Sequence, residues 1–145
     1  MKTRLIYLVP LLLAALITGC SKSSDENNVP VTLPVGTYTG QFLRIRGNVT
    51  TGNLDTTKAN LNLSLSQSTG YAVTGDTSTL QAGSYGSYGV NAYYIQFVDK
   101  TYSQTAPFTK YHLEGIYSYT FDGTNLKIGV TYGDTLSLQY TFVKN

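Results

Sequence analysis

The stretch YSYTFDGTNLKIGVTYGDTLSLQYTFVKN, Tyr117 to Asn145, decides the fold class. Apolar and polar residues alternate along it in three runs, and two short turn sequences, Asp122-Gly123 and Gly133-Asp134, separate the runs. The apolar positions are Tyr117, Tyr119 and Phe121, then Leu126, Ile128 and Val130, then Leu136, Leu138, Tyr140 and Phe142. Glycine tolerates the positive φ that tight hairpins require. The stretch therefore predicts three consecutive antiparallel strands, each with one buried face.

The same period of two residues continues toward the N-terminus. Ala59, Leu61, Leu63 and Leu65 alternate with polar residues, and a turn at 67–70 leads into Tyr71 and Val73. Further strands are predicted at Thr37–Arg46, Thr77–Tyr85, Ala92–Asp99 and His112–Phe121. About eight short strands without a helical period are typical of a barrel or a sandwich. Neighbour-to-neighbour connections favour an all-β, up-and-down meander of antiparallel strands, and closure into a small barrel would remove exposed edges.

The N-terminus has the layout of a secretory signal. Lys2 and Arg4 precede a mostly apolar run from Leu5 to Ile17, and small residues follow it. A membrane helix needs about 20 apolar residues, and this run is shorter and contains Pro10. We predict a signal peptide at 1–19, a tether at 20–34 and one barrel domain at 35–145.

Cys20 is the only cysteine of the chain, and Ile17, Thr18 and Gly19 precede it. These residues resemble the lipobox of bacterial lipoproteins. The resemblance implies that the signal peptide is cut before Cys20, that the Cys20 thiol receives a diacylglycerol, and that acyl chains such as palmitate hold the protein on a membrane. Each buried CH₂ of such chains contributes about 0.8 kcal/mol. The alternative is a buried, inert cysteine or an odd thiol in a secreted protein.

Residues after Cys20 bear on the location. Ser21 stands where an aspartate would suggest inner-membrane retention, and the acidic pair Asp25 and Glu26 resembles an export signal that sends some lipoproteins to the outer face. A purely solvated tether explains the same residues. The prediction is an anchor in the cell envelope, at the outer membrane, with the periplasmic and the surface-exposed side both open.

Charge argues against nucleic acid as a partner. Loss of Lys2 and Arg4 with the signal peptide leaves eight basic residues against eight acidic ones. The densest basic pair is Arg44 with Arg46, which is too little for an electrostatic footprint on a nucleic acid.

The chain offers little for catalysis. His112 is the only histidine, so a zinc site of three or four ligands is hard to build, and we interpret His112 with Glu114 as a solvent-facing salt bridge on a strand. Ser84 and Ser87 lie in AGSYGSYGVN, which reads as a flexible loop and does not fit Gly-x-Ser-x-Gly. Turns explain the scattered aspartates Asp55, Asp76, Asp122 and Asp134. We expect no enzymatic activity, no metal site and no cofactor.

Several segments resemble the small lipocalin-like (calycin-type) domains of bacterial lipoproteins. They are GTYTG at 36–40, the three C-terminal strands, and LSLQYTFVK at 136–144. Two features depart from secreted lipocalins: Tyr38 stands where Gly-x-Trp is usual, and Lys144 is the nearest basic residue to the usual arginine. The resemblance implies a barrel fold but no particular ligand.

Thirteen tyrosines suit either a packed core or an aromatic pocket, since a small barrel can hold one small ligand. In YTGQFLRIR the even positions Tyr38 and Phe42 suggest the inward face, yet Leu43 and Ile45 are odd. Either a bulge switches the phase and leaves the arginines outside, or Arg44 and Arg46 point into the barrel mouth. The second arrangement predicts an anion pocket formed by Tyr38, Phe42, Arg44 and Arg46, suited to a fatty acid or another amphipathic carboxylate.

Two functions therefore remain open. One is a lipid-anchored binding protein for a small apolar or amphipathic ligand. The other is an envelope accessory protein with a solid barrel, whose loops, such as GSYGSYG, contact a protein or glycan partner. Large aromatic side chains that meet at the centre of the barrel would favour the second.

Overall fold

The computed structural model describes residues 31–103, 105 and 109–145. Ile17, Thr18, Gly19 and Cys20, with the signal peptide and tether as far as residue 30, lie outside the described residues. No helix long and apolar enough to cross a membrane occurs among residues 31–103, 105 and 109–145.

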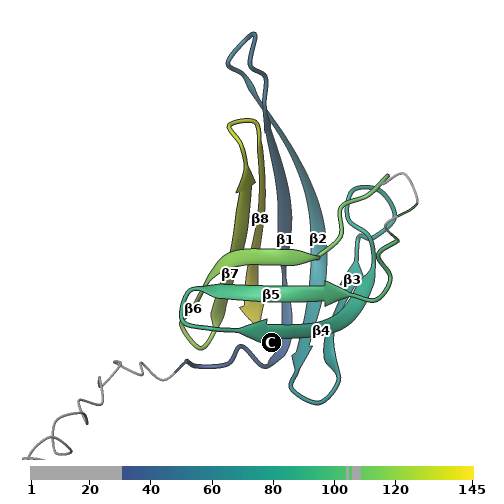
Figure 1. Ribbon diagram of the computed structural model, residues 1–145, viewed down its shortest axis with the longest axis vertical. Helices are drawn as coiled ribbons and strands as arrows, with labels where there is room; N and C mark the ends of the chain where they lie inside the picture. The colour runs from purple at the N-terminus through teal and green to yellow at the C-terminus, as the bar shows by residue number, and fades with distance from the viewer. Residues whose placement is uncertain (1–30, 104, 106–108) are drawn as a thin grey trace, which may run out of the picture.

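Eight antiparallel strands form a closed barrel in the order β1 to β8, which confirms the predicted all-β meander (Figure 1). In chain order they are β1 Gly36–Gly47, β2 Leu54–Ser66, β3 Gly70–Gly75, β4 Ser84–Val90, β5 Tyr94–Asp99, β6 Gly115–Phe121, β7 Asn125–Tyr132 and β8 Leu136–Lys144. The stretch that decided the fold class forms β6, β7 and β8 as predicted.

Closure joins the first strand to the last. β1 pairs with β2 from Gly36 to Gly47 and with β8 from Tyr38 to Arg46, and neither register is interrupted. Every strand therefore finds both neighbours between Gly36 and Lys144, so the barrel is complete without the N-terminal segment. β1 and β2 continue as a hairpin beyond the other strands, while β4, β5 and β6 run across the barrel (Figure 1).

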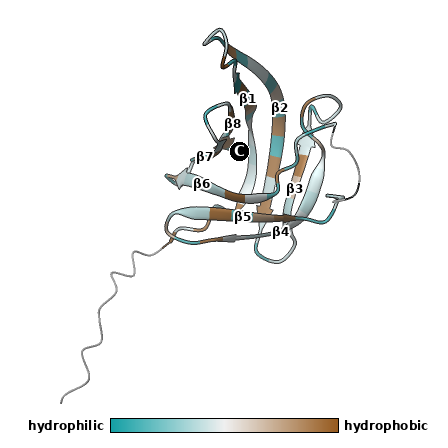
Figure 2. Ribbon diagram, turned by 45° about the horizontal axis from the view of Figure 1, so that its top comes forward, coloured by the Kyte–Doolittle hydropathy of each residue, from teal (hydrophilic) through white to brown (hydrophobic). Residues whose placement is uncertain are grey.

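Alternation of inward and outward side chains builds the core, as the change of hydropathy along β2 and β3 illustrates (Figure 2). On β2 the inward residues Leu61, Leu63 and Leu65 are at most 2% exposed. Tyr38, Tyr117, Tyr140, Phe42, Phe97 and Phe142 are the largest fully buried side chains. The core is thus unusually rich in rings that come from opposite walls of the barrel.

Strand boundaries in the middle of the chain differ from the prediction. Residues 77–80 form a turn, not a strand, and GSYGSYG lies mostly in β4, not in a flexible loop. Gly86 has a packing role there: a Cβ at this position would lie 1.9 Å from the Val98 carbonyl oxygen. Glycine lets β4 approach β5 closely, so a glycine-rich sequence forms a strand.

The sixth strand begins later than predicted. β6 starts at Gly115, whose φ is +99°, and residues 112–114 belong to the segment that precedes it. A positive φ interrupts the extended backbone, so the alternation that starts at Ile116 does not continue back to His112.

A cavity at the hairpin end of the barrel

Aromatic rings fill the middle of the barrel. Their centroids lie 4.7 Å apart for Phe42 and Tyr140, 6.0 Å for Tyr140 and Tyr117, and 6.0 Å for Tyr117 and Phe97. Tyr71 continues the series at 4.9 Å from Phe97. These spacings are those of favourable aromatic pairs, worth about 0.5–1.5 kcal/mol each beyond burial. The chain of rings closes the barrel at this level.

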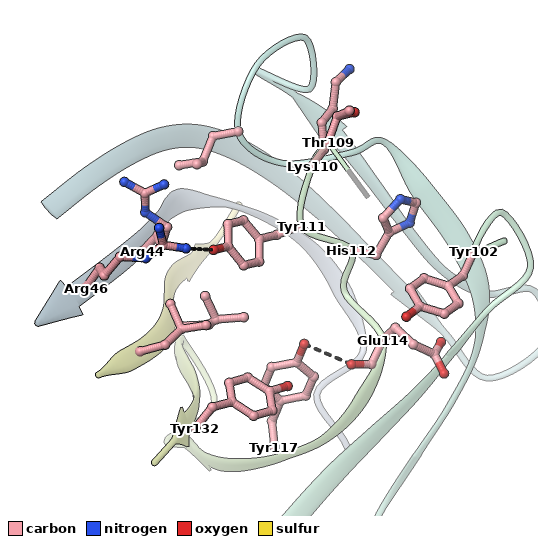
Figure 3. A pocket seen from close by; sticks show the side chains of 13 residues that line it. Arg44, Arg46, Tyr102, Thr109, Lys110, Tyr111, His112, Glu114, Tyr117 and Tyr132 are labelled. Carbon is pink, nitrogen blue, oxygen red and sulfur yellow. Dashed lines mark hydrogen bonds between the residues drawn. The ribbon is translucent and has the colours of Figure 1, made fainter. Parts of the chain in front are cut away.

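Beyond these rings lies a cavity of about 620 Å³. It occupies the end of the barrel where β1 and β7 end and β8 begins, and its volume is in the range of small-molecule sites. Its walls combine charged side chains of both signs, tyrosines and leucines (Figure 3). The lining residues are Arg44, Arg46, Leu80, Tyr102, Thr109, Lys110, Tyr111, His112, Glu114, Tyr117, Tyr132, Leu136 and Leu138.

Arg44 and Arg46 form the β1 wall. The uninterrupted pairing of β1 excludes the bulge, so both arginines keep the inward phase of Phe42. Arg44 Nη2 lies 2.6 Å from Asp55 Oδ2 in an ion pair, and its buried Nε donates no hydrogen bond to the described residues. Asp55 is therefore a residue of β2 that pairs with Arg44, and the prediction that placed it in a turn is wrong.

Arg46 lies nearer the mouth and is exposed. Its Nη2 donates a long hydrogen bond of 3.5 Å to the Tyr111 hydroxyl (Figure 3). Among the described residues no carboxylate forms an ion pair with Arg46. The two arginines differ accordingly: a carboxylate neutralises Arg44, whereas the charge of Arg46 remains available.

A segment that precedes β6 lies across the end of the barrel and supplies the facing wall. The backbone N–H of Tyr111 donates to Leu80 O at 2.9 Å, and the N–H of Ala82 donates to Tyr111 O at 2.8 Å. Lys110 Nζ donates to Thr77 O at 2.9 Å. These bonds hold the Tyr111 ring in the mouth, 6.0 Å from the ring of Phe42.

His112 and Glu114 do not pair with each other, so the predicted salt bridge is wrong. Both contact Asp99, the last residue of β5: His112 Nδ1 lies 2.7 Å from Asp99 Oδ2, and the Glu114 carboxylate accepts the Asp99 backbone N–H. Asp99 Oδ1 also accepts the N–H and the hydroxyl of Thr101. This cluster fastens the segment before β6 to β5. Because residues 112 and 114 precede the strand, the i, i+2 spacing did not place them on one face.

Tyr117 belongs to the floor of the cavity. Its hydroxyl donates to the Glu114 carbonyl oxygen at 3.0 Å (Figure 3), and burial raises its pKa above the ordinary value of 10.0. The hydroxyl therefore stays protonated at neutral pH and acts as a donor.

The four predicted pocket residues separate into two groups. Arg44 and Arg46 line the cavity, whereas Tyr38 and Phe42 are fully buried in the core and do not line it. The Tyr38 hydroxyl donates to Val35 O at 3.3 Å, at the other end of β1. The cavity residues between Thr109 and Glu114 were missed, since only the loss of alternation after Asp99 marks this segment in the sequence.

No protein-family model, no curated protein and no solved structure matches the chain. The barrel is consistent with a lipocalin-like fold. Within residues 31–103, 105 and 109–145, no three His, Cys, Asp or Glu side chains come together as metal ligands would.

Proposed function

We propose that this protein is a lipid-anchored binding protein of the bacterial cell envelope, and that its barrel binds a small amphipathic anion. The observation that carries the proposal is the cavity of about 620 Å³ at the hairpin end, with the cation of Arg46 at its mouth and apolar and aromatic walls behind it. Polar groups that converge on a cavity with aromatic and aliphatic walls are typical of small-molecule sites.

The solid-barrel alternative accounts for only part of the barrel. Large rings do meet at its centre, as that alternative requires. The hollow end is left unexplained, and GSYGSYG, the loop suggested as a contact site, is largely a strand. A ligand in the hollow end explains the cavity and the unbalanced Arg46 together.

The position of the cavity suits an N-terminal lipid. Gly36 begins β1 and Arg46 lies near its other end, so the tether and the mouth of the cavity are at opposite ends of the strand. A strand of this length spans roughly 35–40 Å at about 3.3 Å per residue. A lipid on Cys20 would leave the mouth directed away from the membrane and open to ligands.

Native mass spectrometry tests ligand binding. The chain from Ser21 onward, purified under mild conditions and exposed to a library of amphipathic acids, should carry an extra mass that organic solvent releases. Arg46→Glu should weaken retention at least about tenfold, because reversing a charge beside a carboxylate loses a charge-assisted hydrogen bond. The matched control is Lys127→Glu, a cation on β7 that does not line the cavity. An apo mass with every acid, or equal retention by both variants, would contradict the proposal.

Acylation tests the anchor separately. Cells that express the full chain are fed an alkyne analogue of palmitate, and the label should appear on the wild type in the membrane fraction. Cys20→Ser removes the only thiol, so this variant should lose the label and the membrane association. Equal labelling of both proteins would overturn the lipid anchor without bearing on the cavity.

A further inference from the structure

We propose that the ligand is a compact aromatic monocarboxylate, one carboxylate on a planar ring system, and not a long-chain fatty acid. This inference rests on the proposed function, because it specifies which amphipathic anion the cavity takes. Three features of the cavity carry it: its closed floor, the cation of Arg46 at its mouth and its tyrosine walls.

The floor limits the length of the ligand. Phe42, Tyr140 and Tyr117 are at most 1% exposed, and their rings follow one another across the barrel. An extended acyl chain that entered at Arg46 would meet these rings before it reached the lower half of the barrel. Methylenes that remain outside the cavity stay in water and contribute none of the free energy that burial supplies. Affinity should therefore stop rising with chain length.

Three cations line the cavity, and the cation of Arg46 favours a carboxylate at the mouth. Lys110 Nζ already donates to the Thr77 carbonyl oxygen at 2.9 Å. The ion pair with Asp55 balances Arg44, whereas Arg46 has only the neutral Tyr111 hydroxyl as its observed partner. The planar guanidinium of arginine matches the two oxygens of a carboxylate and can bind them with two parallel hydrogen bonds.

The walls favour a planar ring. Tyr111, Tyr117 and Tyr132 come from three different parts of the chain, and all three border the space beside the arginines (Figure 3). Leu80, Leu136 and Leu138 supply the aliphatic remainder of the walls. Ring–ring contacts are worth about 0.5–1.5 kcal/mol beyond the area they bury, and a flexible alkyl chain also loses rotational freedom when it binds. A rigid aromatic acid gains the ring–ring contacts and loses less rotational freedom than an alkyl chain.

Titration calorimetry with four probes tests the proposal on the chain from Ser21 onward. The probes are 2-naphthoate, the neutral 2-naphthamide, decanoate and palmitate below its micelle concentration. We expect 2-naphthoate to bind at least about tenfold tighter than 2-naphthamide, for which the charge-assisted bond is missing. It should also bind tighter than decanoate, and palmitate should gain little over decanoate.

The variants Arg46→Gln and Lys127→Gln separate the cation at the mouth from general charge. Both side chains are exposed, so both variants should fold. Arg46→Gln should bring the affinities for naphthoate and naphthamide to within about threefold of each other, while Lys127→Gln keeps the full difference.

The outcomes distinguish the two proposals. Affinity that rises steadily from decanoate to palmitate, above that of naphthoate, would overturn the aromatic monocarboxylate and leave an amphipathic binding protein standing. Equal affinity for naphthoate and naphthamide in the wild type would overturn the role of the carboxylate. Absence of binding by all four probes would overturn this inference, and an apo mass with the whole acid library would overturn the proposed function as well.

Discussion

Arg44 and Arg46 are two residues apart on β1, yet their partners give them different roles. Arg44 pairs with Asp55 across the β1–β2 ladder, and Arg46 contacts the Tyr111 hydroxyl at the mouth. Inward charges are costly unless they are paired or solvated. Arg44 is paired and Arg46 is exposed to solvent, so the inner face of β1 can carry both arginines.

Asp122 stabilises the β6–β7 turn through its charge. The backbone N–H of Asn125, its side-chain amide and the N–H of Thr124 lower the pKa of Asp122 from 3.8 to about 2. A lowered pKa in the folded state stabilises the protein above pH 3.8, and this contribution is lost as the pH falls through about 2. Asp122→Ala should therefore lower the urea midpoint at pH 6, and the deficit should shrink toward pH 2. A deficit that does not depend on pH would contradict this prediction.

Buried tyrosines should make the protein sensitive to alkali. Burial raises the pKa of Tyr71, Tyr117 and Tyr140 above 10.0. The unfolded chain then loses these protons first, so stability is complete below pH 10 and falls as the pH rises above it. Absorbance at the phenolate band should show a group of tyrosines that ionise only together with alkaline unfolding. Tyr140→Phe, which removes the most buried of the three hydroxyls, should reduce the slope of stability against pH. An unchanged slope would count against the prediction.

Two nearby glycines of the strand β4 have different structural roles. A Cβ on Gly86 would lie 1.9 Å from the Val98 carbonyl oxygen and 3.2 Å from Asp99 Cα. At Gly89, three residues later in the same strand, no described residue other than its two chain neighbours has a heavy atom within 4 Å of the Cβ position. The first glycine is required for strand packing, and the second is not.

This contrast gives a matched pair of variants. Gly86→Ala should destabilise the barrel by at least about 1–3 kcal/mol, because the new methyl group forces β4 away from β5. Gly89→Ala should be neutral or stabilising by up to about 1 kcal/mol, because it reduces the entropy of the unfolded chain. Denaturant unfolding of both variants measures the difference. Similar denaturant midpoints for the two variants would show that β4 and β5 leave room for a methyl group at Gly86.

The described residues between β5 and β6 supply one wall of the cavity. They have no regular strand pairing beyond the parallel bridge of Tyr111 with Gln81, and side-chain bonds to Asp99 and Thr77 hold them in place. Loops carry binding residues where a rigid scaffold positions them. In this protein the barrel is that scaffold.

In the molecule as a whole, the strands close into a barrel and aromatic side chains fill part of its interior. Pairing of β1 with β8 leaves no free strand edge along the joined parts of the barrel, and aromatic rings fill its middle. The hairpin of β1 and β2 is an exception, because β3 ends at Gly75 beside Leu61 and Asn60. The first residues of β2 therefore have a strand partner on one side only.

Amide hydrogen exchange should detect this asymmetry. Thr56 and Lys58 have the same phase on β2 as Asn62 and Ser64, whose amides face β3. Thr56 and Lys58 should exchange at least about a hundredfold faster than Asn62 and Ser64, since local opening costs much less where no strand pairs. Residues in β8 should be protected despite their place near the C-terminus. Comparable rates at all four β2 amides would mean that another segment covers this edge.

The sequence alone predicts the C-terminal strands of this protein much better than it predicts the cavity. Period-two alternation and glycine turns determine β6, β7 and β8, because one buried face and a tight hairpin are local requirements. The N-terminal resemblance to a lipoprotein is likewise a matter of sequence alone and stays a prediction.

Only the tertiary structure decided the site. The phase of Arg44 and Arg46 depends on the unbroken pairing of β1 with β2 and β8, which alternation within β1 left ambiguous. Tyr111, His112 and Glu114 reach the cavity because Leu80 and Asp99 hold their segment across the barrel, and contacts so distant in sequence leave no periodic pattern. A strand needs only its own side chains to alternate, whereas a cavity exists only where separate segments meet without filling the space between them.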